Sequence, residues 1–182
     1  MEVFISILRG INVSGHNKIL MAELKELYGE LGFLDIVTYI QSGNVIFKAG
    51  KSLSHQDIEE MITAKILGKY TFNVPVLVRT AGEMQKILAA NPFLEQKGMD
   101  ISKLHVTFLS GKPARPAVQA LEKLDHSPDE FRVAGREVYL HIPGGYGNTK
   151  LSNTFFENKL KVRASTRNWK TITTLVGLAT GQ

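Results

Sequence analysis

Two short segments concentrate side chains that can carry charge or form hydrogen bonds. The first runs from Arg9 to Lys18, follows an apolar run, and holds two cations, two asparagines and His16. The second runs from Gln41 to Asn44, between two segments rich in β-branched residues. Guanidinium, ammonium and amide groups orient anionic ligands, and imidazole titrates near neutral pH. These residue types predict a polar binding site in which His16 is the candidate general acid or base.

A third polar stretch lies near the C-terminus. Residues 148–170 hold six Lys or Arg residues and a single Glu, so the net charge of +5 is concentrated there. A localised basic surface attracts phosphates, nucleic acid or an acidic partner, and a solvated helix surface is the structural alternative. The Gly-rich segment before Lys150 is not a P-loop, because Thr149 precedes the lysine and Leu151 follows it. The segment therefore predicts only a loop that can accommodate an anion, or a flexible crossover between the strand and the helix.

Composition excludes several functional classes. The chain has 182 residues, 43% of them hydrophobic, and its lack of cysteine excludes disulfides, thiolate nucleophiles and Cys-ligated zinc. There is no signal peptide and no apolar run of membrane-spanning length, so we expect a soluble cytoplasmic protein without membrane contact. The patterns H-E-x-x-H, G-x-S-x-G and G-x-G-x-x-G are absent, and no metal or cofactor is expected.

The elements that would position the first two segments follow a β-α-β-β-α-β order. Strands are predicted at 3–8, 36–41, 44–48 and 74–79. One helix is predicted to end near Gly32, and a second to begin at Ser54. In this antiparallel arrangement, the loop after the first strand lies at the same sheet end as the hairpin joining the second and third strands. We therefore expect the Arg9–Lys18 segment to lie beside the Gln41–Asn44 hairpin, although Asn and Gly there could instead only shape turns.

The second half is predicted to start with the same order of strands and helices as the first half and to end differently. Strands are predicted at 104–109, 130–134 and 137–142, with helices at 117–124 and 151–160. No final strand is expected, and 164–171 is expected to open a last helix whose apolar stripe starts at Trp169. The predicted fold is α+β, with a ferredoxin-like half at 1–80 and an altered ferredoxin-like half at 81–182, which ends in extra helices and a basic helical tail.

The alternation of side chains along two predicted strands of the second half predicts that two histidines lie close together. If 104–109 and 137–142 pair as antiparallel neighbours, His105 is expected near His141, and Thr107 near Tyr139. Such a pair could serve acid-base chemistry or bind a metal, but the sequence offers no carboxylate as a third ligand. A hydrogen-bonded surface or interface pair is the alternative.

The polar stretches resemble one known family. The segments LRGINVSGHNKI, TYIQSGNVIF, KLSNTFFENKL and STRNWKTI are similar, in this order, to the bacterial proteins of domain-of-unknown-function family 1697. The resemblance implies two ferredoxin-like halves and no particular reaction. The residues that it marks are Arg9, Gly10, Asn12, His16, Asn17, Lys18, Gln41, Ser42, Gly43, Asn44, Lys150, Leu151, Thr166, Arg167, Asn168 and Trp169. Ser14 stands where a glycine is common in the family.

Three functional hypotheses follow. The first is binding of a small anionic ligand, nucleotide-like or phosphorylated, with or without catalysis. Its candidate ligand-binding residues are Arg9, Asn12, Asn17, Lys18, Gln41, Ser42, Asn44, Lys150, Arg167 and Asn168. The second is nucleic-acid binding through the basic 148–170 face, although the aromatic pattern of an RNA-recognition module is absent. The third is a protein-interaction module in which the polar segments only stabilise loops.

Overall fold

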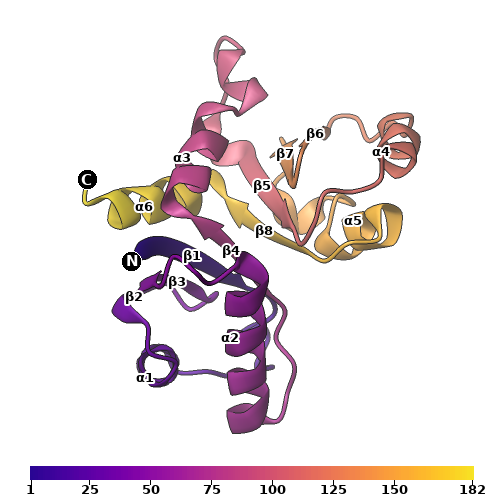
Figure 1. Ribbon diagram of the computed structural model, residues 1–182. Helices are drawn as coiled ribbons and strands as arrows, with labels where there is room; N and C mark the ends of the chain where they lie inside the picture. The colour runs from indigo at the N-terminus through magenta and orange to yellow at the C-terminus, as the bar shows by residue number, and fades with distance from the viewer. The chain divides into compact units, whose positions relative to one another are not determined.

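Two four-stranded antiparallel sheets form the framework, and each half of the chain builds one of them (Figure 1). The computed structural model describes all 182 residues and divides into two compact units. The first unit comprises Met1–Lys86 and Thr174–Gln182, and the second comprises Ile87–Thr173. The predicted α+β fold with two related halves is therefore confirmed. None of the helices combines the length and the apolar character that crossing a membrane requires.

The first sheet has the strand order β2-β3-β1-β4, with every neighbouring pair antiparallel. Its strands are β1 (Glu2–Leu8), β2 (Leu34–Tyr39), β3 (Asn44–Ala49) and β4 (Val76–Thr80). Helices α1 (Met21–Glu30) and α2 (His55–Tyr70) pack against one face of this sheet. The apolar stripes of both helices join alternate residues of the strands in one buried core, as the 3.6- and 2-residue periods require.

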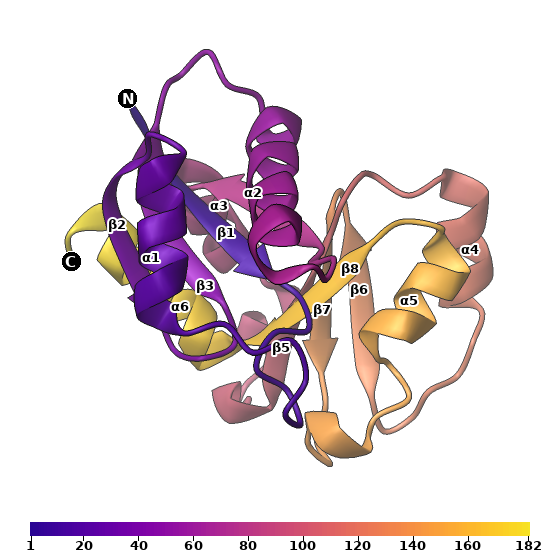
Figure 2. The same ribbon diagram turned by 90° about the horizontal axis from the view of Figure 1, so that it is seen from below.

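The second sheet repeats this arrangement with the order β6-β7-β5-β8. Its strands are β5 (Leu104–Leu109), β6 (Glu130–Ala134), β7 (Glu137–His141) and β8 (Ala164–Asn168). Helices α4 (Arg115–Glu122) and α5 (Asn153–Leu160) lie side by side on one face of it (Figure 2). The remaining helices are α3 (Ala81–Ala89), α6 (Trp169–Thr180) and the 3-10 helices Pro92–Glu95, Ile101–Lys103 and Tyr146–Asn148.

The prediction that the second half lacks its last strand is wrong. Ala164–Asn168 forms the edge strand β8, which pairs with β5 from His105 opposite Asn168 to Leu109 opposite Ala164. Helix α6 begins only at Trp169, where the Asn168 side chain accepts a hydrogen bond from the Thr171 N–H at 2.8 Å. The β8 residues show no apolar alternation, so pairing with β5 rather than local propensity makes them a strand.

The predicted proximity of His105 to His141 is also wrong. In the register of β5 and β7, His105 lies opposite Leu140, and His141 lies opposite Leu104. The two imidazoles therefore project from opposite faces of the sheet. Thr107, similarly, lies opposite Val138 rather than beside Tyr139. Every residue of β5 is buried, so apolar alternation could not assign its two faces.

Candidate functional site

The connection from β1 to α1 is unusually long for a link between a strand and a helix. It runs from Arg9 to Leu20, whereas such connections typically have about four to six residues. We call this segment the β1–α1 loop. Ile11 and Ile19 are buried in the core, while most of the side chains between them are exposed. The loop is therefore anchored by apolar residues and presents polar ones to solvent.

Asn12 holds the β1–α1 loop to the β2–β3 hairpin. Its Nδ2 donates to the carbonyl oxygens of Ile19, at 2.9 Å, and Gln41, at 2.8 Å. Its Oδ1 accepts a hydrogen bond from the Ile19 N–H at 2.9 Å. The Leu8 N–H also donates to the Gly43 carbonyl oxygen at 2.8 Å. These bonds confirm the predicted adjacency of the loop and the hairpin.

The tip of the β1–α1 loop is a tight turn centred on Ser14 and Gly15. The His16 N–H donates to the Val13 carbonyl oxygen at 2.9 Å, and these two residues form an isolated antiparallel bridge. Ser14 and Gly15 have φ values of 49° and 78°, and positive φ at both central positions is typical of a type I′ turn. The turn holds the exposed Val13 and His16 side chains at a defined place on the surface.

Gly43 and Asn44 define the shape of the β2–β3 hairpin. Asn44 is fully buried, and its Nδ2 donates to the Tyr39 carbonyl oxygen and to Ser42 Oγ, both at 3.1 Å. Gly43 has a φ of 85°, and a Cβ atom there would approach Ile11 Cδ1 to 2.7 Å. A glycine is therefore required where the hairpin packs on the loop.

The three candidate asparagines of the first unit all hydrogen-bond to the chain itself. Asn17 Nδ2 donates to the Gly10 carbonyl oxygen at 3.0 Å, in addition to the bonds of Asn12 and Asn44 described above. These contacts favour turn shaping for the asparagines. The candidates with exposed side chains are His16, Lys18 and Gln41, while Arg9 and Ser42 are partly buried.

The remaining candidates, Lys150, Arg167 and Asn168, belong to the second unit. Lys150 is exposed ahead of α5, and Asn168 caps α6. Arg167 Nη1 donates to the Thr166 carbonyl oxygen at 2.9 Å and to Ser165 Oγ at 3.2 Å. Burial lowers the pKa of Arg167 to about 10, and the interaction with Tyr146 opposes that shift. Arg167 therefore remains charged at neutral pH.

Sequence reasoning missed a chain of hydroxyl groups inside the second unit. The Thr166 hydroxyl donates to Asn153 Oδ1 and accepts a hydrogen bond from the fully buried Thr107 hydroxyl, both at 2.7 Å. These bonds join β5, β8 and the first residue of α5. The sequence signal was Thr107 itself, a threonine at an inward position of a strand that is apolar apart from His105. A hydroxyl at such a position has to find a hydrogen-bond partner.

His105 is a second buried polar group that the predicted pairing misplaced. Its ring stacks on that of Tyr146, with centroids 5.0 Å apart and planes inclined by 26°. Desolvation lowers the pKa of His105 below the ordinary value of 6.5. His141 instead lies with Nδ1 3.1 Å from Glu130 Oε1. No group of three or more His, Asp or Glu side chains in the chain is arranged to hold a metal ion.

Comparison with known proteins gives a family and a fold. A family model described as "Protein of unknown function (DUF1697)" matches residues 1–139. The structure of the conserved bacterial protein SP0830 from Streptococcus pneumoniae aligns with a TM-score of 0.77 and 20% sequence identity, covering 98% of each chain. At this identity the likeness establishes the fold alone. A search of curated proteins found no match.

Proposed function

The chain belongs to the DUF1697 family, and we propose that it binds a small anionic ligand at the β1–α1 loop. The ligand is nucleotide-like or phosphorylated. The observation that carries this proposal is that a long surface loop is held in a fixed conformation. Asn12 alone makes three hydrogen bonds to backbone groups there. A preorganised loop binds a ligand without first losing conformational entropy.

The backbone conformation of the loop supports the same proposal. Asn12, Ser14 and Asn17 all have positive φ values, between 48° and 54°. Left-handed conformations at non-glycine residues cost roughly 1–2 kcal/mol each, although asparagine tolerates them better than most residues. A simple connection between a strand and a helix does not need this conformation, whereas such strain recurs at ligand sites.

The charges on the loop define the ligand class. Lys18 is exposed near one end of the loop, Arg9 begins the other end, and His16 is exposed between them in sequence. Ammonium and guanidinium groups make charge-assisted hydrogen bonds to phosphate oxygens. If the site also catalyses a reaction, His16 supplies the imidazole for proton transfer.

A thermal-shift experiment tests this function. Inorganic phosphate, nucleotides and sugar phosphates are titrated against the wild type, Lys18→Ala and Lys25→Ala, the last removing an exposed lysine of α1. At saturating ligand we expect the wild type and Lys25→Ala to gain about 5 °C in Tm, and Lys18→Ala to gain much less. The proposal fails if none of these anions stabilises the wild type, or if Lys18→Ala responds equally.

A protein partner is the second candidate, because exposed apolar side chains lie on the same loop and hairpin. Val13, Leu20 and Ile40 are 55%, 66% and 48% exposed, respectively. Apolar residues grouped on a surface mark interaction sites. A stoichiometric partner that binds the wild type and is lost in Leu20→Asp, together with no response to the anions, would favour this function over ligand binding.

A further inference from the structure

One end of the second sheet gathers cations from segments that are far apart in the sequence. The Leu109 N–H donates to the Arg136 carbonyl oxygen, and the Ser110 N–H donates to the Arg163 carbonyl oxygen, both at 2.9 Å. The Arg163 N–H in turn donates to Ser110 Oγ at 2.9 Å. These bonds join the β5–α4 loop, the β6–β7 turn and the α5–β8 loop. We call this surface the basic end; its cationic residues are Lys112, Arg115, Arg136, Lys159, Lys161 and Arg163.

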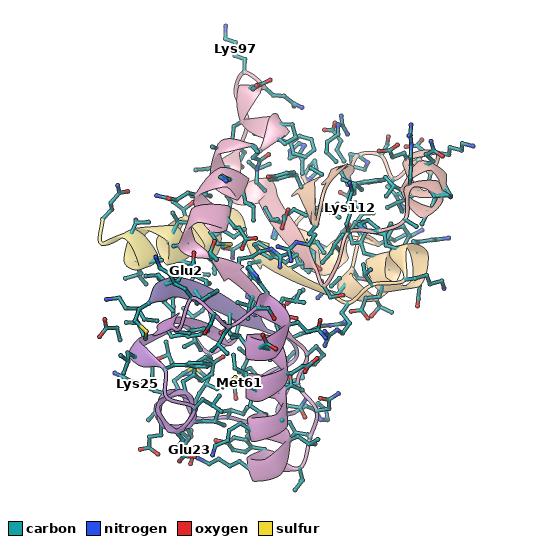
Figure 3. The ribbon with its side chains drawn as sticks, viewed as in Figure 1. Glu2, Glu23, Lys25, Met61, Lys97 and Lys112 are labelled. Atoms are coloured by element: carbon teal, nitrogen blue, oxygen red, sulfur yellow. The ribbon has the colours of Figure 1, made fainter.

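The basic end is accessible and contains few opposing charges. Lys112 and Arg115 line a hollow of about 250 Å³ together with apolar residues of α4 and β6. Lys112, which is labelled in Figure 3, is exposed, as are Arg115, Lys159 and Lys161. Among residues 109–116, 134–137 and 159–164, Glu137 is the single carboxylate, and Glu157 adds a second, because its Oε1 accepts a hydrogen bond from the Ala164 N–H at 3.2 Å. Mutual repulsion among these cations favours a bound polyanion.

The opposite end of the same unit holds an acidic cavity, although Lys150 also lies at that end. This cavity of about 380 Å³ is lined by the carboxylates Glu122, Asp125, Asp129 and Glu130, with His126 and Arg132. Hydrogen bonds from the Ser127 side chain and backbone lower the pKa of Asp125, which keeps this carboxylate ionised. Helix α4 runs from Arg115 at the basic end to Glu122 at the acidic end. This separation of charge orients an approaching polyanion toward the basic end.

We propose that the basic end binds the phosphate backbone of duplex nucleic acid without reading its sequence. Cations spread over three segments of the chain suit a row of phosphates, whereas one small anion would engage only a few of them. The segments that form the basic end contain no aromatic residue on which unpaired bases could stack. The basic end differs from the predicted 148–170 face in two ways. It includes Lys112, Arg115 and Arg136, and it excludes Lys150, which precedes the N-terminus of α5, whereas the basic end lies at the C-terminus of that helix.

Fluorescence anisotropy with labelled duplexes of about 20 base pairs tests this proposal. Between about 50 and 200 mM salt, log K is expected to fall linearly with log salt, with a slope of about −3 to −5. The triple variant Lys112→Glu, Arg115→Glu and Lys161→Glu is expected to lose at least about 30-fold in affinity at the lowest salt. The control reverses the same number of charges elsewhere, at the exposed Lys25, Lys51 and Lys97, and is expected to lose less than about 3-fold.

Several results would overturn the proposal. These are the absence of duplex binding at low salt, binding that salt does not weaken, and equal losses in the two triple variants. Tighter binding of a polyglutamate peptide than of the duplex would instead assign the surface to an acidic protein. Circular dichroism establishes whether each variant folds. If the Lys112→Glu, Arg115→Glu and Lys161→Glu triple variant does not fold, the single variants Lys112→Glu and Lys161→Glu are used instead, and each must weaken binding by about 5-fold.

Discussion

Asn12 shows how an amide that resembles a ligand contact can serve the backbone instead. Both its Nδ2 and its Oδ1 bond to main-chain groups of the loop and the hairpin. The sequence correctly placed Asn12 in a polar cluster, but composition could not distinguish an amide that binds a ligand from one that shapes a turn. The difference depends on which backbone groups the fold brings within 3 Å, and a residue type does not encode that distance.

Replacing Asn12 by Ala is expected to destabilise the first unit. The substitution removes three hydrogen bonds at about 1 kcal/mol each and places Ala at a φ of 54°. We expect a loss of about 3 kcal/mol in the free energy of unfolding, measured with urea. The control, Asn158→Ala at an exposed position of α5, is expected to change it by less than about 0.5 kcal/mol. A change of less than about 0.5 kcal/mol in Asn12→Ala as well would contradict the structural role of Asn12.

His105 is expected to make stability depend on pH. Its pKa in the folded chain lies below 6.5 because burial disfavours the charged imidazole. As the pH falls below about 6.5, the unfolded chain binds a proton at this residue more readily than the folded chain, so stability decreases. The free energy of unfolding should therefore drop less between about pH 7.5 and 5.5 in His105→Gln than in the wild type. Equal drops in the two proteins would show that His105 is not the group responsible.

At the level of elements, apolar periodicity predicted most strands and helices correctly. It failed at β8 and in the register of β5 with β7, and the two failures have different causes. Ala164–Asn168 is a strand because β5 provides hydrogen-bond partners for it, which no local pattern reveals. The His105 error arose because a strand buried on both faces does not show which of its residues share a face with a neighbour.

The packing of the β2–β3 hairpin on the β1–α1 loop predicts a strong effect of a methyl group at Gly43. A Cβ atom there would lie 2.8 Å from Leu8 Cβ and 2.7 Å from Ile11 Cδ1. We expect Gly43→Ala to lower the free energy of unfolding by about 2–4 kcal/mol. Gly32→Ala, which has a φ of 80° but no atom within 4 Å of the new Cβ, is expected to cost about 1 kcal/mol. Equal effects would mean that backbone conformation alone, and not the close contact, requires glycine at 43.

At the level of the whole molecule, the two halves share one strand order although their residues differ. The orders β2-β3-β1-β4 and β6-β7-β5-β8 correspond position by position. The sequence predicted this repeat except for its last strand, β8, and it also predicted the concentration of charge in 148–170. It could not predict that the second unit carries a basic surface at one end and an acidic cavity at the other, because the contributing residues are distant along the chain.

The central claim, that the β1–α1 loop is a preformed anion site, is tested most directly by NMR. Inorganic phosphate and nucleotides are titrated into the 15N-labelled full-length chain, and amide chemical-shift changes are mapped by residue. We predict saturable changes concentrated in Arg9–Leu20 and Gln41–Asn44 that disappear in Lys18→Ala and persist in Lys25→Ala. The absence of changes in these two segments, while other amides titrate with the same anions, would contradict the account.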